Sequence, residues 1–112
     1  MKPLLVETVT GKTMAELRAA RDASRDADMV ELRLDGVADV DVAAALAGRT
    51  RPVIVTCRAE WEGGRFDGSE ETRRAILAEA IDRGAEYVDV EWRAGFDELF
   101  KKRGGKGLIV SA

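Results

Sequence analysis

The chain of 112 residues contains no histidine, one cysteine and two prolines, and aromatic residues make up only 5% of it. Without histidine it lacks the commonest general base and the commonest metal ligand, so acid–base chemistry would depend on carboxylates, lysines or a second chain. The single cysteine, Cys57, cannot form an internal disulfide. No run reaches the roughly 18 apolar residues of a transmembrane helix, and the apolar start of the chain, interrupted by Glu7, is too short for a signal peptide. We therefore expect a cytoplasmic protein with no membrane association.

The charge balance is mildly acidic. The chain has 18 Lys and Arg against 21 Asp and Glu, a formal net charge of −3, whereas a surface that binds nucleic acid needs an excess of basic side chains. We therefore expect no nucleic-acid partner. Hydrophobic residues make up 46% of the chain and fall in short, regularly spaced runs, which argues against disorder. The length fits one domain, residues 1–112.

Apolar runs of strand length alternate with segments that have helical periodicity. The runs are Leu4–Val9, Met29–Leu34, Pro52–Cys57, Tyr87–Val90 and Leu108–Val110, and the helical segments are Thr13–Ala27, Asp41–Ala47, Ser69–Arg83 and Phe96–Lys102. A helix between successive strands implies parallel strands joined by right-handed crossovers. The pattern predicts an α/β fold built from βα repeats.

Three of the helical segments begin with a residue that favours the N-cap position. Thr13 is followed three residues later by Glu16, which is the spacing of a capping box, and Asp41 and Ser69 start the next two segments. In the third segment one apolar stripe is expected to face the core: Ile76, Leu77, Ala80 and Ile81.

Two architectures fit parallel βα repeats, a doubly wound open sheet and a closed barrel. An open sheet that binds nucleotides usually has a glycine-rich phosphate loop after its first strand. The corresponding turn here, Thr8–Thr13, has a single glycine, Gly11, followed by Lys12. We interpret it as an ordinary turn between a strand and a helix.

Polar side chains occupy alternate positions late in strands two to four: Glu31, Arg33 and Asp35; Thr56 and Arg58; Asp89 and Glu91. Helices cover both faces of an open parallel sheet but only the outer face of a barrel, so a charged face indicates a barrel interior. The late position in each strand is the end where barrel active sites form. A polar pocket and a structural network of ion pairs are both compatible with this pattern.

These segments together resemble type I 3-dehydroquinate dehydratases. The resemblance rests on Glu31-Leu-Arg33-Leu-Asp35, on Thr56-Cys-Arg58 followed by Glu62-Gly63-Gly64, on Tyr87-Val-Asp89-Val-Glu91, and on the ending Gly107-Leu-Ile-Val-Ser-Ala112. It implies a (β/α)₈ barrel of the TIM type. The chain would then form roughly the first five strands, a partial barrel in which residues 1–112 make a single N-terminal half-barrel domain.

The resemblance also implies a reaction of the shikimate pathway, the dehydration of 3-dehydroquinate to 3-dehydroshikimate, with no metal and no organic cofactor. In that family a lysine forms a Schiff base with the substrate ketone, and a histidine moves the protons. Carried over to this chain, the substrate-binding residues are Glu31, Arg33 and Arg58. Glu62 would orient the histidine, while Asp89 and Glu91 would surround the reacting centre with negative charge that favours the protonated imine.

The chain departs from the family in having neither the histidine nor a recognisable Schiff-base lysine. The histidine would follow Ala112, and the five lysines of the chain occupy positions typical of solvated surface: Lys2, Lys12, Lys101, Lys102 and Lys106. We therefore predict that the isolated chain is inactive. Open strand edges predict self-association or binding of a complementary half-barrel. A non-catalytic assembly or binding module is the alternative, and a barrel enzyme with phosphate ligands is a third.

Overall fold

The computed structural model describes residues 3–102 and 107–111, in which strands and helices alternate as the sequence predicts. Within these ranges the strands are β1 (Val6–Val9), β2 (Met29–Arg33), β3 (Val53–Thr56), β4 (Tyr87–Glu91) and β5 (Leu108–Ser111). The helices are α1 (Met14–Ala23), α2 (Val42–Leu46), α3 (Glu70–Asp82) and α4 (Asp97–Lys102), and the short 3₁₀ helices η1 (Glu60–Glu62) and η2 (Trp92–Ala94) follow β3 and β4.

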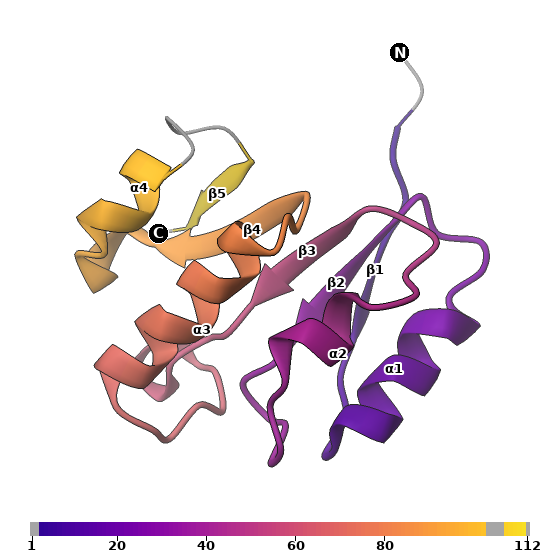
Figure 1. Cartoon of the computed structure of the whole chain (residues 1–112), viewed down its shortest axis with the longest axis horizontal. Helices are drawn as coiled ribbons and strands as arrows, with labels where there is room; N and C mark the ends of the chain where they lie inside the picture. Colours follow the sequence, from indigo (N-terminus) through magenta and orange to yellow (C-terminus); the bar gives the residue numbers. More distant parts are fainter. Residues whose placement is uncertain (1–2, 103–106, 112) are drawn as a thin grey trace.

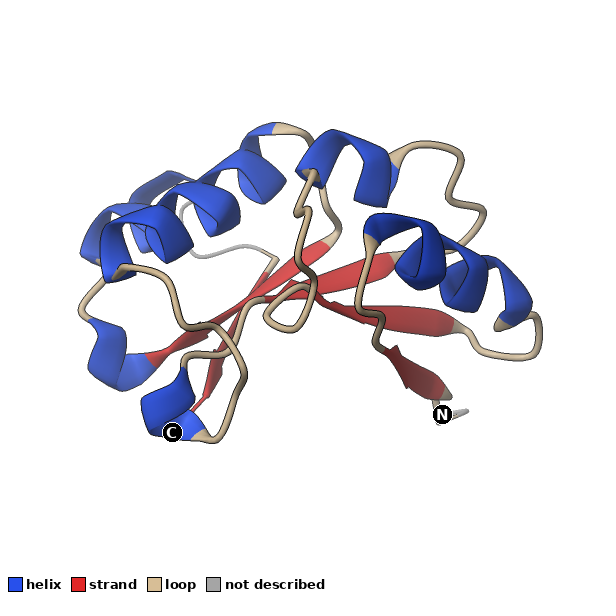
Figure 2. Ribbon diagram, turned by 90° about the horizontal axis from the view of Figure 1, so that it is seen from below, coloured by secondary structure: helices blue, strands red, loops and turns tan. Residues whose placement is uncertain are grey.

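The strands form one parallel sheet in the order β1-β2-β3-β4-β5. The order never reverses, which distinguishes the sheet from doubly wound folds, where a reversal creates the ligand crevice. Figures 1 and 2 show that α1, α2 and α3 all lie over the same face of the curved sheet. A one-sided helix layer on a continuously wound parallel sheet is the arrangement expected of part of a barrel.

The helices begin at the predicted caps. The side-chain oxygens of Thr13, Asp41 and Ser69 accept hydrogen bonds from backbone N–H groups three residues later, at 3.2, 3.1 and 3.1 Å. The prediction that the first helix extends to Ala27 is wrong, because α1 ends at Ala23. Ser24 turns the chain out of the helix with ψ 62°, and its hydroxyl donates to the carbonyl of Ala20 at 3.0 Å.

The first strand is shorter than predicted. It begins at Val6, and Leu4 and Leu5 precede it as exposed residues. The backbone of Leu5 is nevertheless tied to the next repeat, since its N–H donates to Asp28 Oδ2 at 2.8 Å and its carbonyl accepts from the N–H of Asp28 at 2.8 Å. The boundaries of the other four strands, β3 included, differ from the predicted ones by one residue at most at each end.

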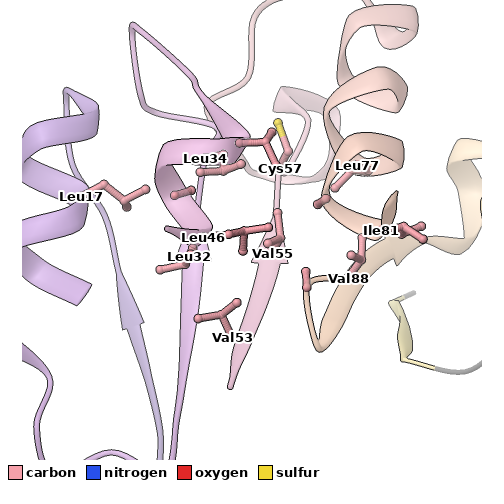
Figure 3. Packing of buried hydrophobic residues seen from close by; sticks show 14 of the residues in the cluster. Leu17, Leu32, Leu34, Leu46, Val53, Val55, Cys57, Leu77, Ile81 and Val88 are labelled. Atoms are coloured by element: carbon pink, nitrogen blue, oxygen red, sulfur yellow. The ribbon is translucent and has the colours of Figure 1, made fainter. Parts of the chain in front are cut away.

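The hydrophobic core fills the space between the sheet and its helices. Figure 3 shows side chains from the strands interleaved with side chains from the helices, among them Val55 and Val88 from the sheet and Leu77 from α3. All three are fully buried. The burial of this one face accounts for the alternation within β2, where Val30 and Leu32 are buried and the residues between them are not completely so.

The strand register gathers the intervening residues on the opposite face. Partners in a parallel pair share a face, and the register places Thr8 beside Glu31, Arg33 beside Thr56 and Glu91 beside Ser111. No helix of α1 to α3 covers this side (Figure 2). The polar residues predicted to point into a barrel therefore do lie on the face that the helices leave uncovered.

Candidate functional site

Glu31 lies at the centre of the polar face, between β1 and β3. Thr8 Oγ1 donates to one carboxylate oxygen at 2.8 Å, and Thr56 Oγ1 donates to the other at 2.6 Å. The two hydroxyls come from the strands on either side of β2, and Thr56 is fully buried. The carboxylate is therefore held at a fixed orientation while each oxygen retains a lone pair for a further donor.

Arg58 follows β3 and is anchored by one end of its guanidinium group. Its Nη1 atom donates to Asp89 Oδ1 at 2.9 Å, to Glu91 Oε2 at 2.8 Å and to Ser111 Oγ at 2.9 Å. Burial alone would lower the pKa of Arg58, but the hydrogen bond to Asp89 and the charges of both carboxylates outweigh burial and raise it. Arg58 is therefore a permanent cation whose Nε and Nη2 have no partner among the described residues.

Arg33 and Asp35 form a second ion pair beside the first. Arg33 donates to both oxygens of Asp35 through Nε and Nη2, each at 3.0 Å. Burial raises the pKa of Asp35, but the hydrogen bonds from Arg33 and from the backbone N–H groups of Arg65 and Arg58 together bring it below its ordinary value. Asp35 thus lies beyond the end of β2, where it fixes Arg33 and the loop after β3.

A pocket of about 450 Å³ opens at the carboxyl ends of β1 and β2, next to this ion pair. Its volume is in the range of small-molecule sites. Charged side chains of both signs and small residues line it: Thr10, Gly11, Lys12, Glu16, Arg33, Asp35, Gly36, Gly63 and Arg65. The pocket and the polar face meet at Arg33, so a small polar molecule could contact both.

The loop after β3 is packed against the site by a glycine. A Cβ atom on Gly64 would lie 2.1 Å from the carbonyl oxygen of Arg58, so the close approach of the two backbones requires glycine there. Gly63 instead has φ +82° with open space around it. The Gly-Gly pair, which the sequence indicates only as a loop, therefore closes η1 onto Arg58.

Glu62 ends η1 and lies apart from the other predicted site residues. Its side chain is half-buried and has no hydrogen bond to any residue within 3–102 or 107–111. The structure thus brings together five of the six residues predicted from the sequence, namely Glu31, Arg33, Arg58, Asp89 and Glu91, and places Glu62 apart from them in η1, after β3. Their roles toward a substrate stay predictions.

Arg73 is the principal residue of this region that the sequence analysis missed. It belongs to α3 yet is completely buried, and it donates to Glu91 Oε1 at 2.7 Å. The helical period offers a signal, because Arg73 stands four residues before Leu77 and seven before Ala80, on the buried side of α3. Ile76, predicted for that stripe, is only half-buried.

The described residues include neither a cluster of potential metal ligands nor a helix able to span a membrane. Residues 3–102 and 107–111 contain no group of three or more Asp, Glu, Cys or His side chains that could hold a metal ion. In the same part of the chain, every helix is too short or too polar to cross a membrane. Of the five lysines, Lys2 and Lys106 lie outside the described residues.

Comparison with known proteins gave a consistent result. The family profile described as Type I 3-dehydroquinase matches residues 6–112. A 3-dehydroquinate dehydratase from Methanothrix thermoacetophila is 42% identical over 97 residues, which cover 85% of this chain and 42% of the relative. A second, from Desulfotalea psychrophila, is 43% identical over 68 residues, 61% of this chain and 30% of the relative.

A solved structure supports the fold. The chain superimposes on a type I 3-dehydroquinate dehydratase from Clostridium difficile with a TM-score of 0.81 at 20% identity, over 99% of this chain and 51% of that one. The match confirms the prediction of an α/β fold whose strands and helices correspond to those of a TIM-type barrel. The chain spans about half or less of the length of the relatives it matches.

Proposed function

The chain belongs to the type I 3-dehydroquinase family, and on this premise we propose that it supplies the substrate-binding face of a 3-dehydroquinate dehydratase. The proposed reaction removes water from 3-dehydroquinate to give 3-dehydroshikimate in the shikimate pathway, in the cytoplasm. Support comes from the names of the relatives and from the cluster of fixed charges on the uncovered face. No metal or organic cofactor takes part in the proposed reaction.

The main support for this proposal is the guanidinium group of Arg58, of which only one nitrogen, Nη1, is bound within the described residues. Three acceptors hold Nη1, while Nε and Nη2 have no partner among the described residues. 3-Dehydroquinate carries a ketone, a carboxylate and hydroxyl groups. Arg58 and Arg33 would donate to its oxygens, and Glu31, held by two threonines, would accept from a hydroxyl.

The remaining carboxylates would act around the reacting carbon. Asp89 and Glu91 lie next to Arg58, and their negative charge would favour the protonated imine that forms when a lysine condenses with the substrate ketone. Glu62, on the loop closed by Gly64, would orient a histidine that moves the protons. Neither reacting group is proposed for this chain: it contains no histidine, and Lys102 is paired with Asp82 at 2.8 Å on the outer helices.

We therefore propose that the isolated chain does not turn over substrate and that it works with further polypeptide, either a complementary half-barrel or a second copy. Within the described sheet β1 and β5 are the edge strands. Exposed apolar residues lie along both of them, with Val6 43% and Val110 51% exposed. Unpaired edges of this kind favour addition of strands from another chain.

Binding can be tested by titrating the ¹⁵N-labelled chain with 3-dehydroquinate and following backbone and guanidinium resonances. The proposal predicts chemical-shift changes concentrated at Glu31, Arg33 and Arg58. It also predicts that R58K binds 3-dehydroquinate at least about tenfold more weakly, because lysine cannot donate from two fixed positions. The matched control is R49K, because Arg49 pairs with Glu86 at 2.9 Å near the amino end of β3 and β4, away from the polar face. Shifts spread over the outer helices would contradict the proposal.

Catalysis can be tested by adding in trans the part of a relative that this chain does not span. The later part of the Methanothrix relative, mixed with this chain, should restore turnover, and borohydride reduction with 3-dehydroquinate should give an adduct on the added polypeptide alone. An adduct on this chain would show that one of its own lysines reacts and would overturn the proposed division of roles.

The second candidate function is a non-catalytic assembly or binding module. The exposed apolar side chains of the edge strands favour it, since they provide an association surface that needs no chemistry. Sedimentation velocity, combined with the binding and complementation measurements above, distinguishes the two candidates. A stable oligomer that binds no 3-dehydroquinate and gains no activity with the added polypeptide would favour the module.

A further inference from the structure

Arg73 has an unusual position for a helical arginine. Its side chain has no exposed surface, although its guanidinium group is charged and comes from α3, in the outer helix layer. Burial alone would lower its pKa, but the hydrogen bonds and charges of Glu70 and Glu91 outweigh burial and raise it. A buried charge is costly unless it is paired, so every contact of this group is a constraint on the surrounding structure.

The contacts of Arg73 reach Arg58 from two directions. Nη1 of Arg73 donates to Glu91 Oε1 at 2.7 Å, and the other oxygen of that carboxylate accepts from Arg58 Nη1 at 2.8 Å. Nη1 of Arg73 also donates to the carbonyl oxygen of Cys57 at 3.0 Å, and Cys57 is the residue directly before Arg58. Arg73 thus fixes both the backbone that carries Arg58 and the carboxylate that holds its side chain.

The rest of the guanidinium group of Arg73 is equally constrained. Nε and Nη2 donate to the two oxygens of Glu70, at 2.8 and 2.7 Å, which is a bidentate pair. The ring of Phe96 lies 4.9 Å and the ring of Trp61 lies 5.7 Å from its Cζ, so aromatic side chains from the loops after β4 and β3 pack around the cation. A planar group with this many fixed contacts cannot turn without breaking several of them.

We propose that Arg73 is a positioning residue that sets the orientation of Arg58 and so determines where the free Nε and Nη2 groups point. The inference rests on the proposed function for its consequence, the recognition of substrate oxygens, but the coupling between the two arginines can be measured without substrate. Lysine at this position keeps the positive charge but cannot contact Glu91, Cys57 and Glu70 in one plane. The orientation of Arg58 therefore depends on the guanidinium group of Arg73 and not on its charge alone.

The experiment measures rotation of the Arg58 guanidinium group by ¹⁵N exchange spectroscopy in the wild-type chain, R73K and the control E70Q. The Glu70 side chain is 47% exposed and contacts Arg73 through Nε and Nη2, whereas Glu91 is bound by Nη1, so E70Q weakens one ion pair and leaves the link to Arg58 intact. We expect slow rotation of the Arg58 guanidinium group in the wild type and in E70Q. In R73K we expect rotation about tenfold faster, because Glu91 loses the charge-assisted hydrogen bond from Arg73 that holds it in place beside Arg58. A role of Arg73 confined to stability would lower the unfolding midpoint of R73K without changing Arg58 rotation.

Substrate binding is then measured on the same three proteins with 3-dehydroquinate. Weaker binding by about tenfold in R73K but not in E70Q supports the inference. If the wild type binds no 3-dehydroquinate, the proposed substrate fails, and the rotation data alone decide the positioning role. Unchanged rotation in R73K overturns the inference whatever the binding result.

A reciprocal measurement covers the case in which R73K does not fold. Coupling between two groups is mutual, so R58K, at a partly exposed position, must change the guanidinium resonances of Arg73. We expect the Arg73 Nη signals to shift in R58K and to stay in place in R49K. Identical Arg73 signals in R58K and wild type would overturn the inference.

Discussion

Thr56 donates its hydroxyl group to Glu31 Oε2 over 2.6 Å and so joins β3 to β2 across the polar face. Thr56 has no exposed surface, and Glu31 is half-buried, so the bond is partly shielded from solvent. It complements the bond from Thr8 to the other oxygen of the same carboxylate. The orientation of the proposed substrate-binding carboxylate thus depends on two hydroxyl groups from two different strands.

Replacing Thr56 with valine tests this arrangement. T56V keeps the shape of the side chain but leaves Glu31 Oε2 without its donor, which should lower the free energy of unfolding by about 1 to 2 kcal/mol. Urea denaturation followed by circular dichroism measures the change. T56S, which keeps the hydroxyl, is the control and should retain more of the stability. Unchanged stability in T56V would show that the hydroxyl bond to Glu31 does not stabilise the fold.

Gly63 and Gly64 are constrained for different reasons, so alanine should destabilise the two positions to different extents. In G64A the added Cβ meets the carbonyl oxygen of Arg58, and we expect a loss of about 3 kcal/mol or more because two backbones must separate. In G63A the residue is only strained by its positive φ, and the loss should be about 1 kcal/mol. Thermal unfolding of both variants checks the order. A G63A protein less stable than G64A would show that the close approach at Gly64 is not the main constraint.

The position of the polar residues at the ends of the strands was predictable, because it follows from the pattern of neighbouring residues within each strand. In β2 and β4 the charged residues alternate with valine and leucine, and a period of two assigns them to one face without knowledge of the neighbours. The hydrogen bonds of Glu31 were not predictable, since they depend on the register that sets Thr8 and Thr56 beside it. The register follows from helix and loop packing over the whole chain.

Asp35 should make stability depend on acid pH. Its pKa in the folded chain lies below the ordinary value of 3.8, so the folded state binds the proton less readily than the unfolded state. The stabilisation is therefore present above that value and is lost as the pH falls below it. D35N should be less stable than wild type at neutral pH, and the difference should shrink in acid. Urea denaturation at neutral and acid pH, with exposed Asp26→Asn as control, checks this. A constant difference at all pH values would contradict it.

Cys57 should be unreactive in the folded chain. Burial, and then the negative charge of Asp35, raise the pKa of its thiol from 9.0 to about 12. The thiolate is the reactive form, so a disulfide reagent should label Cys57 only after denaturation.

The same shift predicts an alkaline effect. Between pH 9.0 and about 12 the unfolded chain loses the thiol proton while the folded chain keeps it, so stability falls as pH rises through this range. C57A, which has no thiol to titrate, should lose less stability over the same range. Rapid labelling of the native chain near neutral pH would contradict both expectations.

The ion pair between Arg73 and Glu91 could not be predicted from the sequence, because it joins residues that are far apart in the chain. An arginine three residues after a glutamate on a charged helix resembles a solvated surface pair, and such pairs are common. The burial of Arg73 is favourable because its side chain also pairs with Glu91 on β4, 18 residues away, and donates to the carbonyl of Cys57, 16 residues away. Long-range charge pairing leaves no local pattern, whereas apolar periodicity does, so the core of α3 was largely predictable and this contact was not.

In β2, adjacent residues have different structural roles, because successive side chains point to opposite faces of the sheet. Val30 and Leu32 contribute to the packed interior, while Glu31 between them contributes only to the polar face. A combinatorial library that varies Glu31 and Arg33 therefore changes the polar face and leaves the apolar packing of Val30 and Leu32 in place. In directed evolution, such a library alters recognition without opening cavities in the core, and a separate library at the even-numbered positions alters the core alone.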